Sequence, residues 1–293
     1  MFLCEIKIML IDKEIIKKIN KFVAEKPRTI QEVSLFIGKS WRTADRYVKE
    51  IAEKEGTIKT RTFRGGTRGA LKVVYWNNLS DISGTAFQER LFKKIEMGRD
   101  KLDFSPFDIY QYADEKKRSA FLEQQEDENV NANQNIIGAM EEVQEEILFF
   151  SGNLSWANLR QGNKKIIDFF KRLAEKNINL KFLARVDVTS LKNVQKILSL
   201  NKAAGKERFF VRHCEQPLRA FIVDNKFIQL KEIKDPKDYE KEELSKKTYI
   251  FYEIYDKEWV NWLRDVFYKL YRSAVPAQDR LKNMKTIQNI VKV

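Results

Sequence analysis

Apolar side chains recur at helical spacing in three short stretches of the first 56 residues. The first stretch follows Asp12, a residue type that caps helix N-termini, and it ends before Pro27. The second begins with a capping-box pattern at residues 29–32, and Gly38 is placed to end it in a left-handed cap. Ser40 is placed to cap the third. The pattern predicts three consecutive short helices.

The third predicted helix has an apolar face and a polar face. Its inward positions are Ala44, Val48, Ile51 and Ala52. Its outward positions are Arg42, Thr43, Arg46, Tyr47 and Lys49. Two helices joined by a short turn that contains glycine are typical of a helix-turn-helix, whose second helix enters the DNA major groove. The five outward residues are therefore candidate DNA contacts.

Two segments of alternating apolar and polar residues, 57–63 and 70–76, follow the third helix. An Arg- and Gly-rich stretch at residues 64–69 separates them, which predicts a β-hairpin with a basic tip. Three helices and a hairpin make a winged helix, in which Arg64 and Arg68 reach phosphate or the minor groove. The basic residues of the hairpin are Lys59, Arg61, Arg64, Arg68 and Lys72. Winged helices also serve as protein–protein modules, and that alternative stays open.

Residues 81–122 are predicted to form two helical stretches, broken at a Ser-Pro step at residues 105–106. The apolar face of the first consists of Phe87, Leu91, Phe92 and Ile95, and that of the second of Phe107, Tyr110, Phe121 and Leu122. Polar residues 124–135 are typical of a linker. We expect a helical linker over residues 79–135 that either forms a dimer contact or packs on its own chain.

From residue 135 onward, predicted helices alternate with apolar predicted strands. The helices are predicted at residues 136–146, 164–176, 190–200 and 258–271. The strands are predicted at residues 147–151, 180–186, 208–213, 218–223, 227–231 and 249–254. Such alternation predicts an α/β layer structure over residues 136–293, in which helices cover a mixed sheet. With a first domain at residues 1–78, the fold class is multidomain, α+β and α/β.

Composition narrows the classes of function. The chain has 293 residues, of which 43% are hydrophobic and 12% aromatic, enough for two domains with buried cores. The apolar N-terminal stretch contains Glu5 and Lys7 where a signal peptide has an unbroken apolar core, so we expect a cytoplasmic protein. Cys4, Cys214 and the single histidine, His213, are too few for a disulfide framework or a Cys/His metal site. We expect neither metal nor cofactor.

Basic charge is concentrated near the N-terminus. The formal net charge is +13, and residues 1–78 contain 17 basic and 9 acidic side chains. Residues 57–80 contain no acid, whereas residues 123–146 contain eight acids and no lysine or arginine. A local basic surface favours a polyanionic partner, with double-stranded DNA first, and a solvated face on an ordinary basic protein is the alternative.

Several segments resemble known families. One half of a phospholipase D-like domain is resembled by three segments of the chain. They are residues 145–153 (EEILFFSGN), 166–186 and 217–230. The order and spacing of residues 12–77 resemble the winged helix-turn-helix of archaeal and bacterial transcriptional regulators. Together the layout resembles the TrmB-like family of archaeal regulators. The resemblance implies an N-terminal winged helix, a helical linker and a C-terminal phospholipase D-like domain at residues 136–293.

The phospholipase D resemblance also predicts where a catalytic motif would lie. Active members carry His-x-Lys-x4-Asp, and here Arg219 and Asp224 match its second and third positions. Pro217 stands at the position of the nucleophilic histidine, so we expect no catalytic residue and no enzyme activity. Arg219 and Asp224 would then form an ion pair or a remnant anion site. His213 is expected to be an ordinary strand residue.

Three hypotheses of function follow from these patterns. The first is a sequence-specific, DNA-associated transcriptional regulator that acts as a homodimer, with half-sites about one helical turn apart or a multiple of it. Its phospholipase D-like domain would serve dimerisation or the sensing of a small-molecule effector of unknown identity. The second is an architectural, chromatin-like DNA-binding protein without sequence preference. The third is a phospholipase D-like nuclease.

Overall fold

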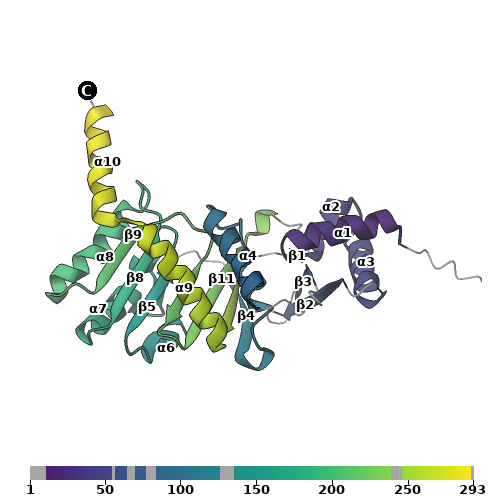
Figure 1. Cartoon of the computed structure of the whole chain (residues 1–293), viewed down its shortest axis with the longest axis horizontal. Helices are drawn as coiled ribbons and strands as arrows, with labels where there is room; N and C mark the ends of the chain where they lie inside the picture. Colours follow the sequence, from purple (N-terminus) through teal and green to yellow (C-terminus); the bar gives the residue numbers. More distant parts are fainter. Residues whose placement is uncertain are drawn as a thin grey trace, which may run out of the picture. The chain divides into compact units, whose positions relative to one another are not determined.

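The computed structural model describes residues 11–54, 57–64, 70–76, 84–125, 135–238, 244 and 246–291. The chain divides into two compact units (Figure 1). One comprises Met1–Asp81 with Pro236–Ser245, and the other Ile82–Asp235 with Lys246–Val293. Each unit has an apolar core of its own.

The first unit contains three helices and a three-stranded antiparallel sheet. Its elements are α1 (Lys13–Glu25), β1 (Arg28–Thr29), α2 (Ile30–Ile37), α3 (Trp41–Lys54), β2 (Ile58–Arg64) and β3 (Ala70–Trp76), and the order in the sheet is β1-β3-β2. The predicted caps are confirmed. Asp12 accepts a hydrogen bond from the backbone of Glu14, Thr29 and Glu32 form the capping box, and Gly38 is left-handed with a φ of 62°.

The core of the first unit lies between the three helices and one face of the hairpin. Ile19 of α1, Ile30 of α2 and Val48 of α3 are fully buried, as are Ile58 of β2 and Val74 of β3. The three predicted amphipathic helices are therefore confirmed, because the apolar face of each one packs on the same small core.

An eight-stranded mixed sheet forms the second unit. Its order is β13-β9-β8-β5-β10-β11-β12-β4. The parallel strands are β5 (Glu146–Phe150), β8 (Asn179–Ala184) and β9 (Phe209–His213). The antiparallel strands are β10 (Ala220–Val223), β11 (Phe227–Lys234), β12 (Lys247–Ile254), β4 (Arg118–Gln125) and β13 (Val275–Pro276). The mixed sheet that was predicted from the apolar strands is present.

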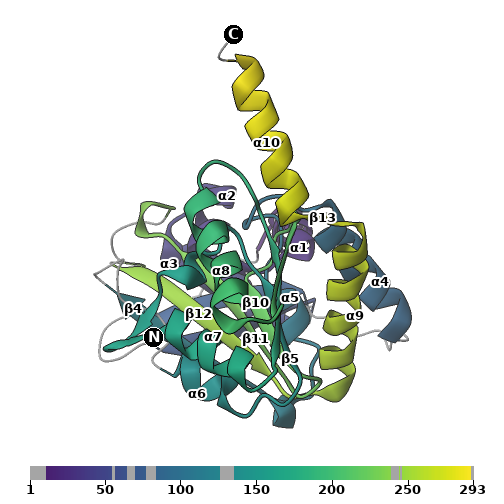
Figure 2. The same ribbon diagram turned by 90° about the vertical axis from the view of Figure 1, so that its left-hand side faces the viewer.

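Helices cover both faces of this sheet (Figure 2). The helices of the second unit are α4 (Gly84–Met97), α5 (Phe107–Tyr110), α6 (Ile136–Glu141), α7 (Ile166–Glu175), α8 (Leu191–Ala204), α9 (Lys257–Ser273) and α10 (Ala277–Val291), and all but α10 lie along the sheet. Successive residues of β5 face opposite sides. Phe149 packs against Phe170 of α7, with 5.5 Å between ring centroids, and Phe150 packs against Phe267 of α9 at 5.3 Å. The fully buried strand β5 is thus the centre of the unit.

The expectation of a helical linker over residues 79–135 is wrong in its second part. Residues 107–110 form only one short helix, and residues 118–125 form strand β4, paired with β12 from Arg118 opposite Ile254 to Gln125 opposite Lys247. Phe121 stacks on Phe251 across this pair, with 5.0 Å between ring centroids. Pairing with β12 and the stacking of Phe121 on Phe251 favour a strand for residues 118–125. Both contacts join residues far apart in the sequence, so local helical spacing does not reveal them. Residues 79–83 and 126–134 of the expected linker lie outside the described residues.

Helix α10 was not predicted. It extends away from the sheet in Figures 1 and 2. Leu281 and Met284 of this helix pack against the apolar core of the second unit, and Ala277 at its start is fully buried. Its first half is thereby anchored. Among the helices in the described ranges, none combines the length and apolar character that crossing a membrane requires.

Candidate nucleic-acid interface and candidate ligand cavity

Helix α3 presents two arginines on successive turns. Arg42 and Arg46 are exposed, and the guanidinium of Arg46 lies 5.3 Å from the centre of the Tyr47 ring. Thr43 is half-buried. Its backbone N–H donates to the Ser40 hydroxyl, and the hydroxyl oxygens of Ser40 and Thr43 lie 2.9 Å apart. Of these predicted contacts, the two arginines have the exposure that a phosphate or base contact needs.

The expectation that Tyr47 points outward is wrong. Its side chain belongs to the core of the first unit and is 7% exposed. Position 47 follows Ala44 by three residues and precedes Ile51 by four, so it lies on the same helical stripe as these inward residues. An aromatic side chain there widens the apolar face, and Tyr47 acts as a support beneath Arg46.

A carboxylate, Asp45, ties α3 to the hairpin. It accepts from Lys72 of β3 at 2.7 Å and from Lys49 of its own helix at 2.9 Å. Burial alone would raise the pKa of the Asp45 carboxyl, but the hydrogen bonds from Lys72 and Lys49 outweigh it and hold this pKa below its usual value. The Lys72 side chain is only 15% exposed. Two predicted phosphate contacts thus share one carboxylate.

The remaining predicted contacts lie on β2 and at the hairpin tip. Lys59 is exposed, and Arg61 is half-buried with its guanidinium 5.4 Å from the Phe63 ring centre. Arg64 is the last residue of β2, and its side chain lies outside the described residues, as does the whole of Arg68. The basic wing tip therefore stays a prediction.

The second unit contains a cavity of about 380 Å³ at the carboxyl end of β5. Phe150, Ser151, Gly152 and Asn153 line it where β5 ends. Its charged and titratable lining consists of Arg99, Asp100, Lys101, Arg185, Cys214, Glu215, Arg219 and Lys231. Its apolar lining includes Ile136, Trp156, Leu159, Phe221, Ile233 and Phe251. The cavity therefore combines an excess of cations with aromatic and aliphatic walls.

The loop after α4 builds one wall of this cavity. The Lys101 ammonium donates to the carbonyl oxygens of Gln216 and Leu218, at 2.6 Å each. Gln216, 2% exposed, donates in turn to the carbonyl of Ser151 at 3.0 Å. A Cβ at Gly98 would lie 2.8 Å from the Pro217 side chain, so only glycine permits this close approach. Pro217 is thus buried beneath the loop.

Withdrawal from water changes the titration of the cavity cations. Burial, and next the positive charge of Arg219, lowers the pKa of Lys101 to about 7. The same two causes lower the pKa of Lys231 to about 8. Burial also lowers the pKa of Arg219 and raises that of the Cys214 thiol. An anion in the cavity would reverse these effects on the lysines.

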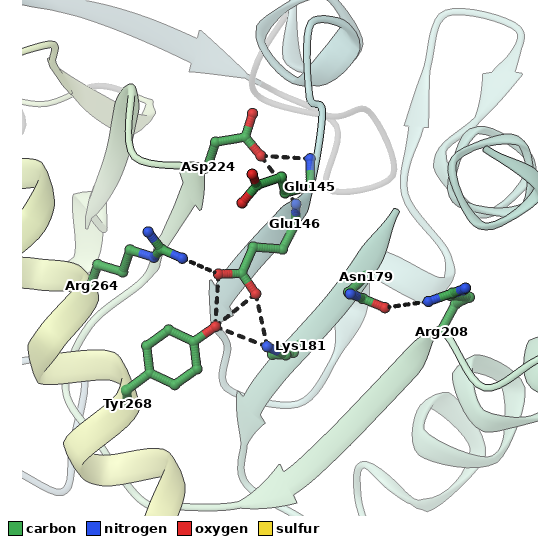
Figure 3. A network of polar contacts seen from close by, with 8 residues as sticks. All are labelled: Glu145, Glu146, Asn179, Lys181, Arg208, Asp224, Arg264 and Tyr268. Atoms are coloured by element: carbon green, nitrogen blue, oxygen red, sulfur yellow. Dashed lines mark hydrogen bonds and ion pairs between the residues drawn. The ribbon is translucent and has the colours of Figure 1, made fainter. Parts of the chain in front are cut away.

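The expected ion pair between Arg219 and Asp224 is wrong. Arg219 precedes β10 and Asp224 follows it, so the two side chains lie at opposite ends of the strand. The Asp224 carboxylate accepts from the backbone N–H groups of residues 144, 145 and 146, at 2.9 to 3.1 Å. Figure 3 shows the contacts to residues 145 and 146. The backbone of Asp224 lies in the left-handed region, with a φ of 50°. Asp224 therefore fixes the start of β5 and lies outside the cavity lining.

A buried polar cluster around Glu146, the first residue of β5, lies beside Asp224 (Figure 3). The Glu146 carboxylate accepts from Lys181 at 2.8 Å and from Arg264 and Tyr268 at 2.7 Å each. Burial alone would raise the pKa of Glu146, but hydrogen bonds from Lys181, Tyr268 and Arg264 hold it below its usual value. Sequence reasoning missed this cluster, and the one signal was a glutamate at the start of an apolar strand.

His213 is an ordinary residue of β9, as predicted. Its Nδ1 accepts from the backbone N–H of Val186 at 2.9 Å. Burial, and next the positive charge of Arg280, lowers the pKa of its imidazole. The histidine acts as a neutral acceptor that joins two strand ends.

No protein-family model matches the sequence, and no curated protein matches it. Solved structures show low-identity likenesses. The chain is similar to a phospholipase D family member, Nuc from Salmonella typhimurium, at 11% identity and a TM-score of 0.39, over 55% of this chain and 98% of that one. It is similar to NucT from Helicobacter pylori at 15% identity and a TM-score of 0.39, over 55% of this chain and 99% of that one.

A third likeness covers more of the chain. TrmBL2, described as an archaeal chromatin protein with a novel mode of DNA binding, is 14% identical with a TM-score of 0.38, over 89% of this chain and 93% of that one. The large mixed sheet of the second unit is consistent with the expected α/β layer structure. The phospholipase D-like fold, the winged helix, dimerisation and regulation stay proposals.

The expectation that the chain is not an enzyme is contradicted by two of these likenesses, because a phospholipase D family member belongs to a family named for an enzyme. The expectation relied on Pro217 at the position of the nucleophile and on His213 being the single histidine of the chain. A proline there removes an imidazole from one position, which excludes one route to hydrolysis by that residue. The proline says nothing about catalysis by other side chains of the domain. The expectation that the chain is not an enzyme is therefore withdrawn.

Proposed function

We propose that this protein binds double-stranded DNA through its first unit, as a homodimeric, sequence-specific transcriptional regulator. In this proposal the unit is a winged helix, with α2 and α3 as the helix-turn-helix and the β2–β3 hairpin as the wing. Three helices followed by an antiparallel hairpin support it, as does the excess of basic residues over residues 1–78.

The observation that carries the proposal is the exposure of Arg42 and Arg46 at the start of α3. The N-terminal turns of a recognition helix are the part that approaches base edges. Guanidinium groups there can bind a guanine edge or a phosphate with two hydrogen bonds. Lys49 and Lys72 support them less, because Asp45 accepts from both.

Binding to a labelled DNA duplex at several salt concentrations tests this proposal. The double variant Arg42→Ala/Arg46→Ala should lose about tenfold or more in affinity, and its dependence on salt should fall by about two counterions. The matched control is Lys17→Ala/Lys18→Ala, which removes two exposed cations of α1. Unchanged affinity in the α3 variant, or an equal loss in both variants, would rule out α3 as the interface.

Selection of bound sequences from a random DNA pool then separates a regulator from an architectural protein. A regulator should enrich one motif, and Arg46→Ala should relax it at one position by about 1 to 3 kcal/mol of discrimination. A pool that stays random would support the architectural alternative. Sedimentation of the protein alone and with DNA tests the dimer, for which we expect half-sites about one helical turn apart or a multiple of it.

A further inference from the structure

We propose that the cavity at the carboxyl end of β5 binds a small organic anion, with its acidic group between Arg219, Lys231 and Lys101 and its apolar body against the aromatic wall. Phosphate, sulfonate and carboxylate groups share the required chemistry. This proposal goes beyond DNA binding and does not depend on it, because every lining residue belongs to the second unit.

The first argument is the juxtaposition of two cations, Lys231 on β11 and Arg219 directly before β10. The backbone N–H of Lys231 donates to the carbonyl of Arg219 at 2.8 Å, so the two residues lie opposite each other. Like charges in that position repel and destabilise a sheet. In the part of the chain that the structure describes, neither side chain forms an ion pair. A bound anion between them would remove the repulsion and supply the missing acceptors.

The second argument is the rigid construction of the cavity. Lys101 is held by two carbonyl oxygens of residues 216 and 218, and Gln216 is held by Ser151. Asp103 accepts from the backbone N–H groups of Arg99 and Asp100, at 2.8 Å each, and fixes the loop that carries Lys101. Positions set by hydrogen bonds before binding reduce the entropy that a ligand has to overcome.

The third argument is the wall that faces these cations. Phe221 and Ile233 lie two residues along from Arg219 and Lys231, and so share their face of the sheet. Trp156 packs edge-on against Phe221, with 6.0 Å between ring centroids. Five basic residues line the cavity, with Asp100 and Glu215 as its acids. Arg185 is paired with Asp187, which lies outside the lining. An inorganic ion would use the cations and leave the aromatic wall unused.

Calorimetric titration with defined probes tests the proposal. Phenyl phosphate and benzenesulfonate should bind, inorganic phosphate should bind at least about tenfold more weakly, and benzyl alcohol should not bind. Arg219→Gln and Lys231→Met should each weaken benzenesulfonate binding by about tenfold or more. The matched control is Lys192→Met, an exposed lysine of α8 that is absent from the cavity lining. Thermal unfolding of each variant establishes that it is folded.

The pH dependence provides a second readout, because a sulfonate does not titrate in the range used. Benzenesulfonate should bind more tightly at about pH 6.5 than at about pH 9, since Lys101 and Lys231 become protonated as the pH falls. Lys101→Met should reduce this difference. Three results would overturn the proposal: no binding of either aromatic anion, equal binding of benzyl alcohol, or anion binding that the Arg219 and Lys231 variants leave unchanged.

Discussion

The two ends of strand β5 carry polar clusters of opposite design. At its start, the Glu146 carboxylate is surrounded by Lys181, Arg264 and Tyr268, and each contact lies within 2.8 Å. At its carboxyl end, Arg219 and Lys231 face a cavity with no carboxylate in ion-pair contact among the described residues. The first cluster is complete without a ligand. The second becomes complete only when an anion enters, and that difference separates a structural cluster from a candidate binding site.

The largest effect is expected from Glu146→Ala, which should lower the free energy of unfolding by about 3 kcal/mol. This is the lower end for breaking a buried ion pair, because Lys181 and Arg264 are 22% and 30% exposed and recover some hydration. Denaturant unfolding measures it. The control is Asp168→Ala, which breaks an exposed pair with Lys171 and should cost less than about 1 kcal/mol.

The same cluster predicts an acid-dependent loss of stability. The pKa of Glu146 is lowered in the folded protein, so folding favours its ionised form. Its contribution is present above the unfolded value of 4.5 and is lost as the pH falls below it. Wild-type protein should lose more stability than Glu146→Gln over this interval. Parallel losses in the two proteins would contradict the structural role of the cluster.

Asp224→Ala should have an intermediate effect of about 2 kcal/mol, since it leaves the three N–H groups at the start of β5 without their acceptor. Alanine also fits poorly at a φ of 50°. Asp224→Asn keeps one carbonyl oxygen and tolerates that φ, so it should cost clearly less. Denaturant unfolding of both variants ranks them, and equal costs would contradict this account, because neither the retained acceptor oxygen nor the tolerance of that φ would then contribute.

The elements of both units were largely predictable because each follows from local periodicity. The caps at Asp12, Thr29 and Gly38 and the buried strand β5 are examples. Strand β4 was not predictable, since its partner β12 lies more than 120 residues later in the sequence. The burial of Tyr47, by contrast, is compatible with helical spacing, because this residue lies three positions after Ala44 and four before Ile51, and it was assigned to the wrong face of the helix.

The candidate sites differ in the same way. The exposed arginines of α3 follow from a single helix, so sequence reasoning found them. The cavity is assembled from residues on separate elements, and Lys101 meets Gln216 and Leu218 only in the folded protein. Arg219 was identified by its motif position. Its cross-strand neighbour Lys231 was overlooked, although its place opposite Arg219 follows from the hairpin register once the turn at Asp224 is known.

The smallest effect is expected from Lys101→Met, and it concerns the slope of stability against pH. The pKa of Lys101 is about 7 in the folded protein and 10.5 in the unfolded one, so between these values the unfolded chain binds more protons. Stability of the wild type should therefore rise as the pH increases from about 7 to about 8. The ceiling is about 1.4 kcal/mol for one group over one pH unit, and we expect about 0.5 because Lys101 keeps contact with water.

Lys101→Met should flatten this rise. It also removes two hydrogen bonds, and their loss lowers the absolute stability at every pH. The slope is the informative quantity for that reason. Lys231, with a pKa of about 8, contributes in the same direction at slightly higher pH, so Lys101→Met/Lys231→Met should be flatter still. Lys192→Met should keep the wild-type slope. If the double variant retained that slope as well, the cavity cations would be as well hydrated as those on the surface, and the contrast between the two ends of β5 would fail.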